Sequence, residues 1–212
     1  LMKVSYYKIG KEFRRVKKSY LNRLKLIFAR GDFINSKSNF LFEKKISNLL
    51  KVKYTCGVAN GSDALEVGML ALGIKKGDEV ITAANSWVSS LTSIINIGAK
   101  PILVDVDDDF NIDCKMLKKA ITRKTKAIMP VHLNGLPANM SEIMKISKKY
   151  KIKVVEDSAQ AILSKINNKY AGTIGHIGCF SMHPTKNLGV AGDGGFIVTN
   201  NKNFFDRMKL IS

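Results

Sequence analysis

Two stretches of the sequence place reactive side chains next to apolar, strand-like segments. The stretch 180–195, FSMHPTKNLGVAGDGG, holds Lys186 between such a segment and a glycine-rich loop. The stretch 153–161, KVVEDSAQA, ends an apolar run at Asp157 and places Gln160 about one turn further on. A lysine amine can form a Schiff base with a carbonyl, and a carboxylate can keep a pyridine nitrogen protonated. These are two of the groups that a pyridoxal phosphate site needs.

A third stretch supplies a candidate phosphate site. Residues 58–74, VANGSDALEVGMLALGI, run from a strand-like segment through Gly61 and Ser62 into an apolar helical pattern. Unpaired amides at a helix start bind anions such as phosphate. Simpler interpretations stay open for each stretch taken alone: Ser62 or Asp157 could cap a helix or turn, and Lys186 could face solvent.

The elements around these stretches alternate between short β-branched runs and longer helical patterns. Strands are predicted at 54–58, 79–83, 101–105, 127–131, 153–156, 178–181 and 195–199. Helices are predicted between them at 63–72, 89–97, 113–120 and 140–150, with further helical stretches at 11–30, 39–50 and 204–211. This alternation predicts an α/β fold, a three-layer αβα arrangement with a mainly parallel seven-stranded sheet and ligands at the carboxyl ends of its strands.

Composition narrows the class of protein. The chain has 212 residues, of which 45% are hydrophobic, enough for a folded core. The sequence contains no apolar stretch of membrane-spanning length, and Lys and Arg fill the first thirty residues where a signal peptide would be apolar. We therefore expect a cytoplasmic protein with no membrane partner. Cys56, Cys114 and Cys179 are widely spaced, so neither disulfides nor a metal site is expected.

The formal net charge of +18 raises the question of a polyanionic partner. The lysines are spread along the whole chain in pairs, at positions typical of the polar faces of helices, and no nucleic-acid-binding motif accompanies them. We therefore expect no nucleic acid partner. A non-catalytic basic binding module stays as an alternative function.

A series of blocks resembles the DegT/DnrJ/EryC1/StrS family of sugar aminotransferases, which are fold-type I pyridoxal phosphate enzymes. The blocks run in family order over 32–212: NGSDAL, GDEVITAANSWVSS, GAKPILVDVD, TKAIMPVHLNG, VVEDSAQA and GCFSMHPTKNLGVAGDGGFIVTN. The resemblance implies an aspartate aminotransferase-like large domain at 51–212, preceded by an N-terminal helical and connecting segment at 1–50. Because family members continue past the last block, a C-terminal small domain is expected to be missing from this chain.

The resemblance assigns the cofactor-binding residues. Lys186 is implied to be the Schiff-base lysine and catalytic residue, and Asp157 to pair with the pyridine nitrogen of pyridoxal 5'-phosphate. Gln160 is implied to lie by the 3-hydroxyl of the cofactor. Ser181 is implied to hold the phosphate together with Gly61 and Ser62.

Further assignments concern residues around the cofactor. Trp87 matches the aromatic position whose ring stacks on it. His132 and His183 fall in family blocks, and each is either a substrate contact or a hydrogen-bonded structural residue. Asp193 is expected to fix its own loop. The sequence departs from the family at 34–39, INSKSN, where members commonly have a Gly-Pro turn.

The activity that the resemblance implies is transfer of an amino group to a nucleotide-linked keto sugar, with glutamate as the amino donor. A homodimer with the active site at the interface is expected. Dehydratases of the same family are a further alternative, but they have His where this chain has Lys186. Other fold-type I enzymes, such as desulfurases, are disfavoured by the blocks HPTKNLG and VHLNG.

Overall fold

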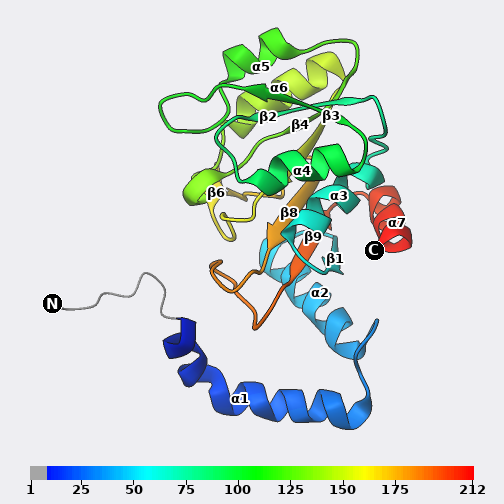
Figure 1. Ribbon diagram of the computed structural model, residues 1–212, viewed down its shortest axis with the longest axis vertical. Helices are drawn as coiled ribbons and strands as arrows, with labels where there is room; N and C mark the ends of the chain where they lie inside the picture. The colour runs from blue at the N-terminus through cyan, green and yellow to red at the C-terminus, as the bar shows by residue number, and fades with distance from the viewer. Residues whose placement is uncertain (1–8) are drawn as a thin grey trace, which may run out of the picture.

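The computed structural model describes residues 9–212 as a seven-stranded sheet covered by helices on both faces (Figure 1). The strands are β1 (Tyr54–Val58), β2 (Glu79–Ala83), β3 (Lys100–Val104), β4 (Thr125–Met129), β5 (Lys153–Asp157), β8 (Ile177–Ser181) and β9 (Gly195–Thr199). Their order is β1-β9-β8-β5-β4-β2-β3, and only β9 runs antiparallel to its neighbours. The predicted mainly parallel αβα fold is confirmed.

Helices pack on the sheet in two layers. One layer contains α3 (Gly61–Ala71), α4 (Val88–Asn96) and α7 (Lys202–Ile211). The other contains α5 (Cys114–Ala120) and α6 (Met140–Tyr150), with α2 (Lys37–Leu50) covering the end of the sheet formed by β1, β9 and β8. Single residues in the strands alternate between the two layers: Val80 and Val155 face the α3 side, whereas Ile81 and Val154 face the α6 side.

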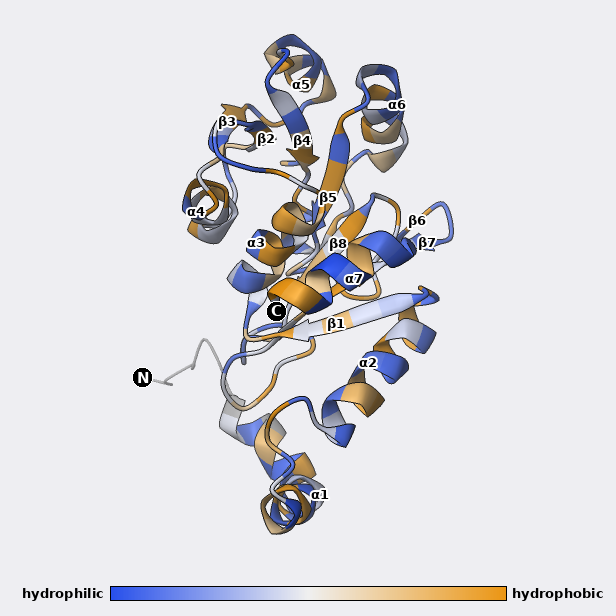
Figure 2. Ribbon diagram, turned by 90° about the vertical axis from the view of Figure 1, so that its right-hand side faces the viewer, coloured by the Kyte–Doolittle hydropathy of each residue, from blue (hydrophilic) through white to orange (hydrophobic). Residues whose placement is uncertain are grey.

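Helix α1 (Ile9–Arg30) lies apart from the sheet and carries both hydrophobic and hydrophilic residues (Figures 1 and 2). Several of its large apolar side chains are exposed, among them Val16, Leu26 and Phe28. Among residues 9–212, α1 and the other helices all lack the combination of length and apolar character needed to cross a bilayer.

The sequence missed two small elements, both close to the site. A hairpin of β6 (Lys165–Ile166) and β7 (Lys169–Tyr170) lies between β5 and β8, and a 3₁₀ turn, η1 (Leu133–Gly135), follows β4. The hairpin turns through Asn167 and Asn168, which both have positive φ angles. Each of its strands is only two residues long, so the alternation that identifies a strand has no room to develop.

Gly178 in β8 allows this strand to pass close to the loop that contains Gly172. A Cβ atom added at Gly178 would overlap the backbone carbonyl of Gly172, and backbone cannot move aside as a side chain can. We therefore expect Gly178→Ala to lower the free energy of unfolding by about 3 kcal/mol, measured by denaturant titration. Gly10→Ala is the matched control: Gly10 lies in α1 with open space around its Cα, so this change should raise helix stability by about 0.5–1 kcal/mol. Equal effects of the two changes would contradict the role of Gly178.

Candidate active site

The predicted reactive residues meet at one edge of the sheet because parallel strands end on the same side. Asp157 is the last residue of β5, and Ser181 is the last residue of β8, the parallel neighbour of β5. The chain leaves β8 into the loop 182–194, which carries Lys186 and returns to the sheet as β9. The topology therefore positions all three residues.

The start of α3 lies directly against Ser181. A Cβ atom built on Gly61 would lie 2.7 Å from the Cβ of Ser181, so only glycine permits this contact. The cap of α3 is Asn60, whose Oδ1 accepts a hydrogen bond from the Asp63 amide at 2.8 Å. Capping by Ser62, the simpler interpretation of this stretch, is therefore wrong.

The cap by Asn60 leaves donors at the start of α3 for a ligand. Among the hydrogen bonds of residues 9–212, the backbone amides of Gly61 and Ser62 and the Ser62 hydroxyl have no acceptor within the chain. A helix N-terminus also carries a partial positive charge. Together with the Ser181 hydroxyl, these groups can bind a phosphate.

Asp157 is a buried carboxylate with only two donors from the protein. Its side chain accepts hydrogen bonds from the Ser90 hydroxyl at 2.8 Å and from the Ala159 amide at 3.2 Å, and the residue is 6% exposed. Desolvation by burial raises the pKa of this carboxyl, while the Ser90 bond, the Ala159 bond and the positive charge of Lys186 act in the opposite direction. A cationic N–H group placed here would relieve the cost of burying the ionised form.

The neighbouring carboxylate, Glu156, faces the opposite side of β5 and has a structural role. It accepts hydrogen bonds from the amides of Gly172, Ile174 and Gly175 and contacts His132 Nε2 at 2.9 Å. The Nδ1 atom of His132 accepts from the Ala138 amide, so Nε2 carries the proton and donates it to Glu156. Because His132 is completely buried and both its ring nitrogens are bonded, the structural interpretation holds for this histidine.

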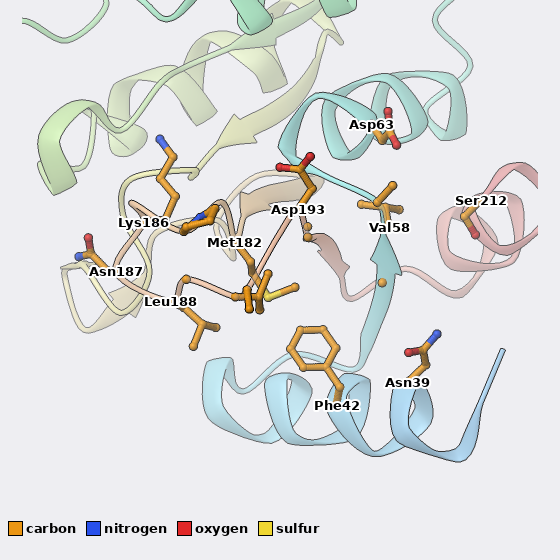
Figure 3. Close-up of a pocket in the computed structure, with 18 of the residues that line it drawn as sticks. Asn39, Phe42, Val58, Asp63, Met182, Lys186, Asn187, Leu188, Asp193 and Ser212 are labelled. Carbon is orange, nitrogen blue, oxygen red and sulfur yellow. The ribbon is translucent and has the colours of Figure 1, made fainter. Parts of the chain in front are cut away.

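Lys186 lies in the loop after β8, where its amide bonds to the His183 carbonyl at 2.8 Å. Its side chain borders a cavity of about 1350 Å³ between this loop, α1 and α2. In Figure 3 the Lys186 side chain extends away from Phe42 on the α2 side of that cavity. Its positive charge favours the ionised form of Asp157 and so opposes the rise in the pKa of that carboxyl.

Gln160 and Trp87 lie at the margin of the candidate site. The Oε1 atom of Gln160 accepts a hydrogen bond from the Asn134 amide at 2.8 Å, which ties Gln160 to the turn after β4. Trp87 precedes α4, and its ring is 71% exposed. The structure links Trp87 to Asp157 only through the first turn of α4, since the Ser90 amide bonds to the Trp87 carbonyl at 3.0 Å. An exposed ring at this position is available for stacking.

His183 and Asp193 both lie on the loop that carries Lys186. The Nδ1 atom of His183 is 2.9 Å from the Thr185 hydroxyl, and the residue is exposed, so contact with a substrate stays a prediction. Asp193 was expected to fix its loop. Within the described part of the chain its carboxylate forms no hydrogen bond, and Figure 3 shows it at the cavity instead.

The sequence reasoning missed that Ser90 binds Asp157. Ser86 precedes α4 and Ser90 lies in the first turn of α4, and their hydroxyls are 2.6 Å from each other. Both serines are part of NSWVSS, but Ser90 and Asp157 are 67 positions apart, so only the folded structure reveals their contact.

The residues at this edge fit pyridoxal phosphate. A carboxylate accepts up to about four hydrogen bonds, so Asp157, with two donors, has capacity for a pyridinium N–H. The amides of Gly61 and Ser62 lie where a phosphate can bind, and Lys186 supplies an amine. Among the described residues no cluster of His, Cys, Asp and Glu side chains is arranged to hold a metal. Fold and site thus match what a domain that binds pyridoxal phosphate requires.

Comparison with known proteins gives the family. The family model of the DegT/DnrJ/EryC1/StrS aminotransferases matches residues 15–212, and the chain belongs to this family.

Similar proteins include aminotransferases that act on nucleotide sugars. One is the UDP-N-acetyl-3-dehydro-alpha-D-glucosamine 3-aminotransferase of Acidithiobacillus ferrooxidans, 42% identical over 188 residues, covering 88% of this chain and 51% of the relative. Another is the GDP-perosamine synthase of Escherichia coli O157:H7, which is 42% identical over 178 residues. That match covers 82% of this chain and 49% of the relative. The chain spans about half the length of these relatives.

Among solved structures, NtdA from Bacillus subtilis, determined with bound cofactor PMP, superposes with a TM-score of 0.92. It is 35% identical, and the match covers 98% of this chain and 47% of NtdA. An aminotransferase of the same family from Brucella abortus superposes with a TM-score of 0.93 at 32% identity. That match covers 98% of this chain and 58% of the Brucella chain. Of these two neighbours, one is described as an aminotransferase of this family, and the other holds PMP, the amine form of the cofactor.

Proposed function

We propose that this chain carries the cofactor-binding domain, residues 51–212, of a pyridoxal phosphate-dependent aminotransferase that converts a nucleotide-linked keto sugar to an amino sugar. The observation that carries the proposal is the convergence of Asp157, the Gly61–Ser181 contact and the loop of Lys186 at one edge of the sheet. The similar proteins named for reactions on UDP- and GDP-linked sugars support the choice of substrate class.

The position of each residue and the resemblance to the family together suggest its role. Pyridoxal phosphate supplies an electron sink for the transfer of an amino group when it is bound. The amides of Gly61 and Ser62 and the Ser181 hydroxyl would bind its phosphate. Asp157 would pair with the ring nitrogen and keep it protonated, and Gln160 would lie by the 3-hydroxyl.

Two further residues act on the reacting face. Trp87 would cover one face of the cofactor ring and shield it from water. With the cofactor bound, the Nζ atom of Lys186 would hold it covalently in the resting enzyme, and the free amine would serve as general base toward the α-carbon of the amino donor. The same amine would serve as general acid toward the sugar carbon.

Glutamate is the proposed amino donor. A relative from Bacillus subtilis that is 39% identical over 183 residues is named a 3-oxo-glucose-6-phosphate:glutamate aminotransferase. We also propose a homodimer with the active site at the subunit interface, consistent with the exposed apolar side chains of α1.

The test is a half-reaction followed by absorbance. The chain is mixed with pyridoxal phosphate and L-glutamate, and the absorption band of the bound aldehyde form should give way to that of the amine form. A UDP-, GDP- or dTDP-linked keto sugar added next should restore the first band and yield an amino sugar detectable by mass spectrometry. D-Glutamate is the control for stereospecific proton transfer and should leave the first band unchanged.

The outcomes separate the candidate functions. If L-glutamate leaves the bound cofactor unchanged, transamination from this donor is ruled out. If only a 3-oxo sugar phosphate without a nucleotide restores the first band, the substrate class is wrong while the reaction type stands. A chain that binds no pyridoxal phosphate and retains DNA at physiological salt would instead favour the basic binding module.

A further inference from the structure

Two serine hydroxyls form a short chain of hydrogen bonds that ends on Asp157. The Ser90 hydroxyl donates to Asp157 Oδ2 at 2.8 Å, and Ser86 Oγ lies 2.6 Å from Ser90 Oγ. Ser90 is 1% exposed, so its hydroxyl is shielded from solvent in the folded chain. Ser86 is half-buried, and its hydroxyl is the outermost group of this series of hydrogen bonds.

The direction of these bonds follows from counting protons. A serine hydroxyl has one proton, and an ionised carboxylate can only accept. When Asp157 is ionised, the proton of Ser90 is directed at Oδ2, so Ser90 must accept the proton of Ser86. Both hydroxyl dipoles then point toward the negative charge, and each strengthens the other.

The chain of hydrogen bonds also fixes the geometry of the carboxylate. Oδ2 is held by Ser90 on α4, and Oδ1 is held by the Ala159 amide that follows β5. Two donors from two different elements prevent rotation of the carboxylate about its terminal bond. The carboxylate lone pairs of Asp157 that have no donor therefore keep a fixed orientation.

The other ionisable groups around Asp157 do not substitute for the serines. His132, after β4, donates its ring proton to Glu156, and Glu156 itself faces the opposite side of β5. Cys179, beside Asp157 on β8, directs its thiol to the Ala64 carbonyl at 3.1 Å. Lys186 acts on Asp157 through its charge, and among the described residues it forms no salt bridge with it.

We propose that Ser86 and Ser90 are positioning residues that hold the Asp157 carboxylate ionised and in one orientation, ready to pair with the ring nitrogen of the cofactor. The inference rests on the proposed function for the identity of that partner. The effect on Asp157 itself can be measured without any cofactor.

The first measurement is an NMR titration of the cofactor-free chain labelled with ¹³C at aspartate. Removing a donor to the ionised form disfavours that form, so Ser90→Ala should move the titration of Asp157 to higher pH, and Ser86→Ala should move it less. Ser90→Thr, which keeps a hydroxyl, should restore the wild-type titration. Ser89→Ala is the matched control, because within residues 9–212 the Ser89 hydroxyl forms no hydrogen bond, and it should have no effect.

The second measurement is the affinity for pyridoxal phosphate by absorbance titration. We expect a loss of about tenfold for Ser90→Ala and little change for Ser90→Thr and Ser89→Ala, because a carboxylate that lacks this donor is less readily ionised and pairs less well with a protonated ring nitrogen.

An Asp157 titration that is the same in wild type and in both Ser→Ala variants would overturn the inference. If Ser90→Ala does not fold, as circular dichroism would show, Ser86→Ala decides, since Ser86 lies nearer the surface. If the variants show the shifts but the wild-type chain binds no pyridoxal phosphate, the inference for Asp157 is supported and the proposed function is not.

Discussion

Replacing Lys186 with alanine should abolish covalent attachment of pyridoxal phosphate to this chain. Reduction with borohydride fixes the link between an amine and the cofactor aldehyde, so wild type should yield one modified peptide that contains Lys186. In Lys186→Ala that peptide carries no amine to be modified. Transamination should fall by on the order of 10²–10⁴-fold, because proton transfer at the reacting carbon alone contributes this much. Mass spectrometry of the digested chain reads out the adduct.

A very basic chain requires a control for indiscriminate modification. Lys169 is an exposed residue of the β6–β7 hairpin, and Lys169→Ala should leave the adduct and the activity unchanged. Since Lys and Arg together number 35 in this sequence, scattered modification of surface amines would appear equally in all variants. An adduct that persists at wild-type yield in Lys186→Ala would disprove the assignment of this lysine.

Replacing Asp157 with asparagine should affect activity and stability in opposite directions. The amide is neutral and cannot hold the ring nitrogen protonated. Breaking a buried charge pair costs about 3–5 kcal/mol, so activity should fall by roughly 10²–10³-fold. In the cofactor-free chain the same change removes a carboxyl whose ionisation is penalised by burial, so the free energy of unfolding should hold or increase.

The pH dependence of the free energy of unfolding tests whether the Asp157 carboxylate destabilises the cofactor-free chain. Because burial raises the folded-state pKa of Asp157 above its ordinary value of 3.8, the folded chain binds this proton more tightly than the unfolded chain. Stability should therefore fall as the pH rises from about that value to the raised folded-state pKa, and level off above it. Thermal melts of wild type and Asp157→Asn across this interval should converge at low pH and diverge above it. Parallel curves would show that Asp157 carries no raised pKa.

The sequence predicted the strands and the residues at their ends because those features depend on local pattern. Seven short apolar runs marked the sheet, and Asp157 and Ser181 were placed at its carboxyl edge by counting to the end of a run. Their proximity then followed from the parallel pairing of β5 and β8. Contacts between distant residues could not be obtained in this way.

Three features show where the local sequence pattern could not predict the structure. The turn NGS offers several candidate caps, and only the backbone conformation of Asn60 selects it over Ser62. The bond from Ser90 to Asp157 joins α4 to β5, elements whose relative placement depends on the whole sheet. The structural role of His132 required knowing that Glu156 and the Ala138 amide lie on either side of its ring.

The pair of carboxylates at the end of β5 shows what a parallel sheet contributes to this chemistry. Glu156 and Asp157 are adjacent in sequence and carry the same functional group, yet one is saturated by backbone amides and the other keeps acceptor positions for a ligand. Which side chain receives which environment depends only on the register of β5 against its neighbours. An insertion or deletion of one residue within β5 would exchange the two environments, because successive side chains of a strand face opposite sides of the sheet.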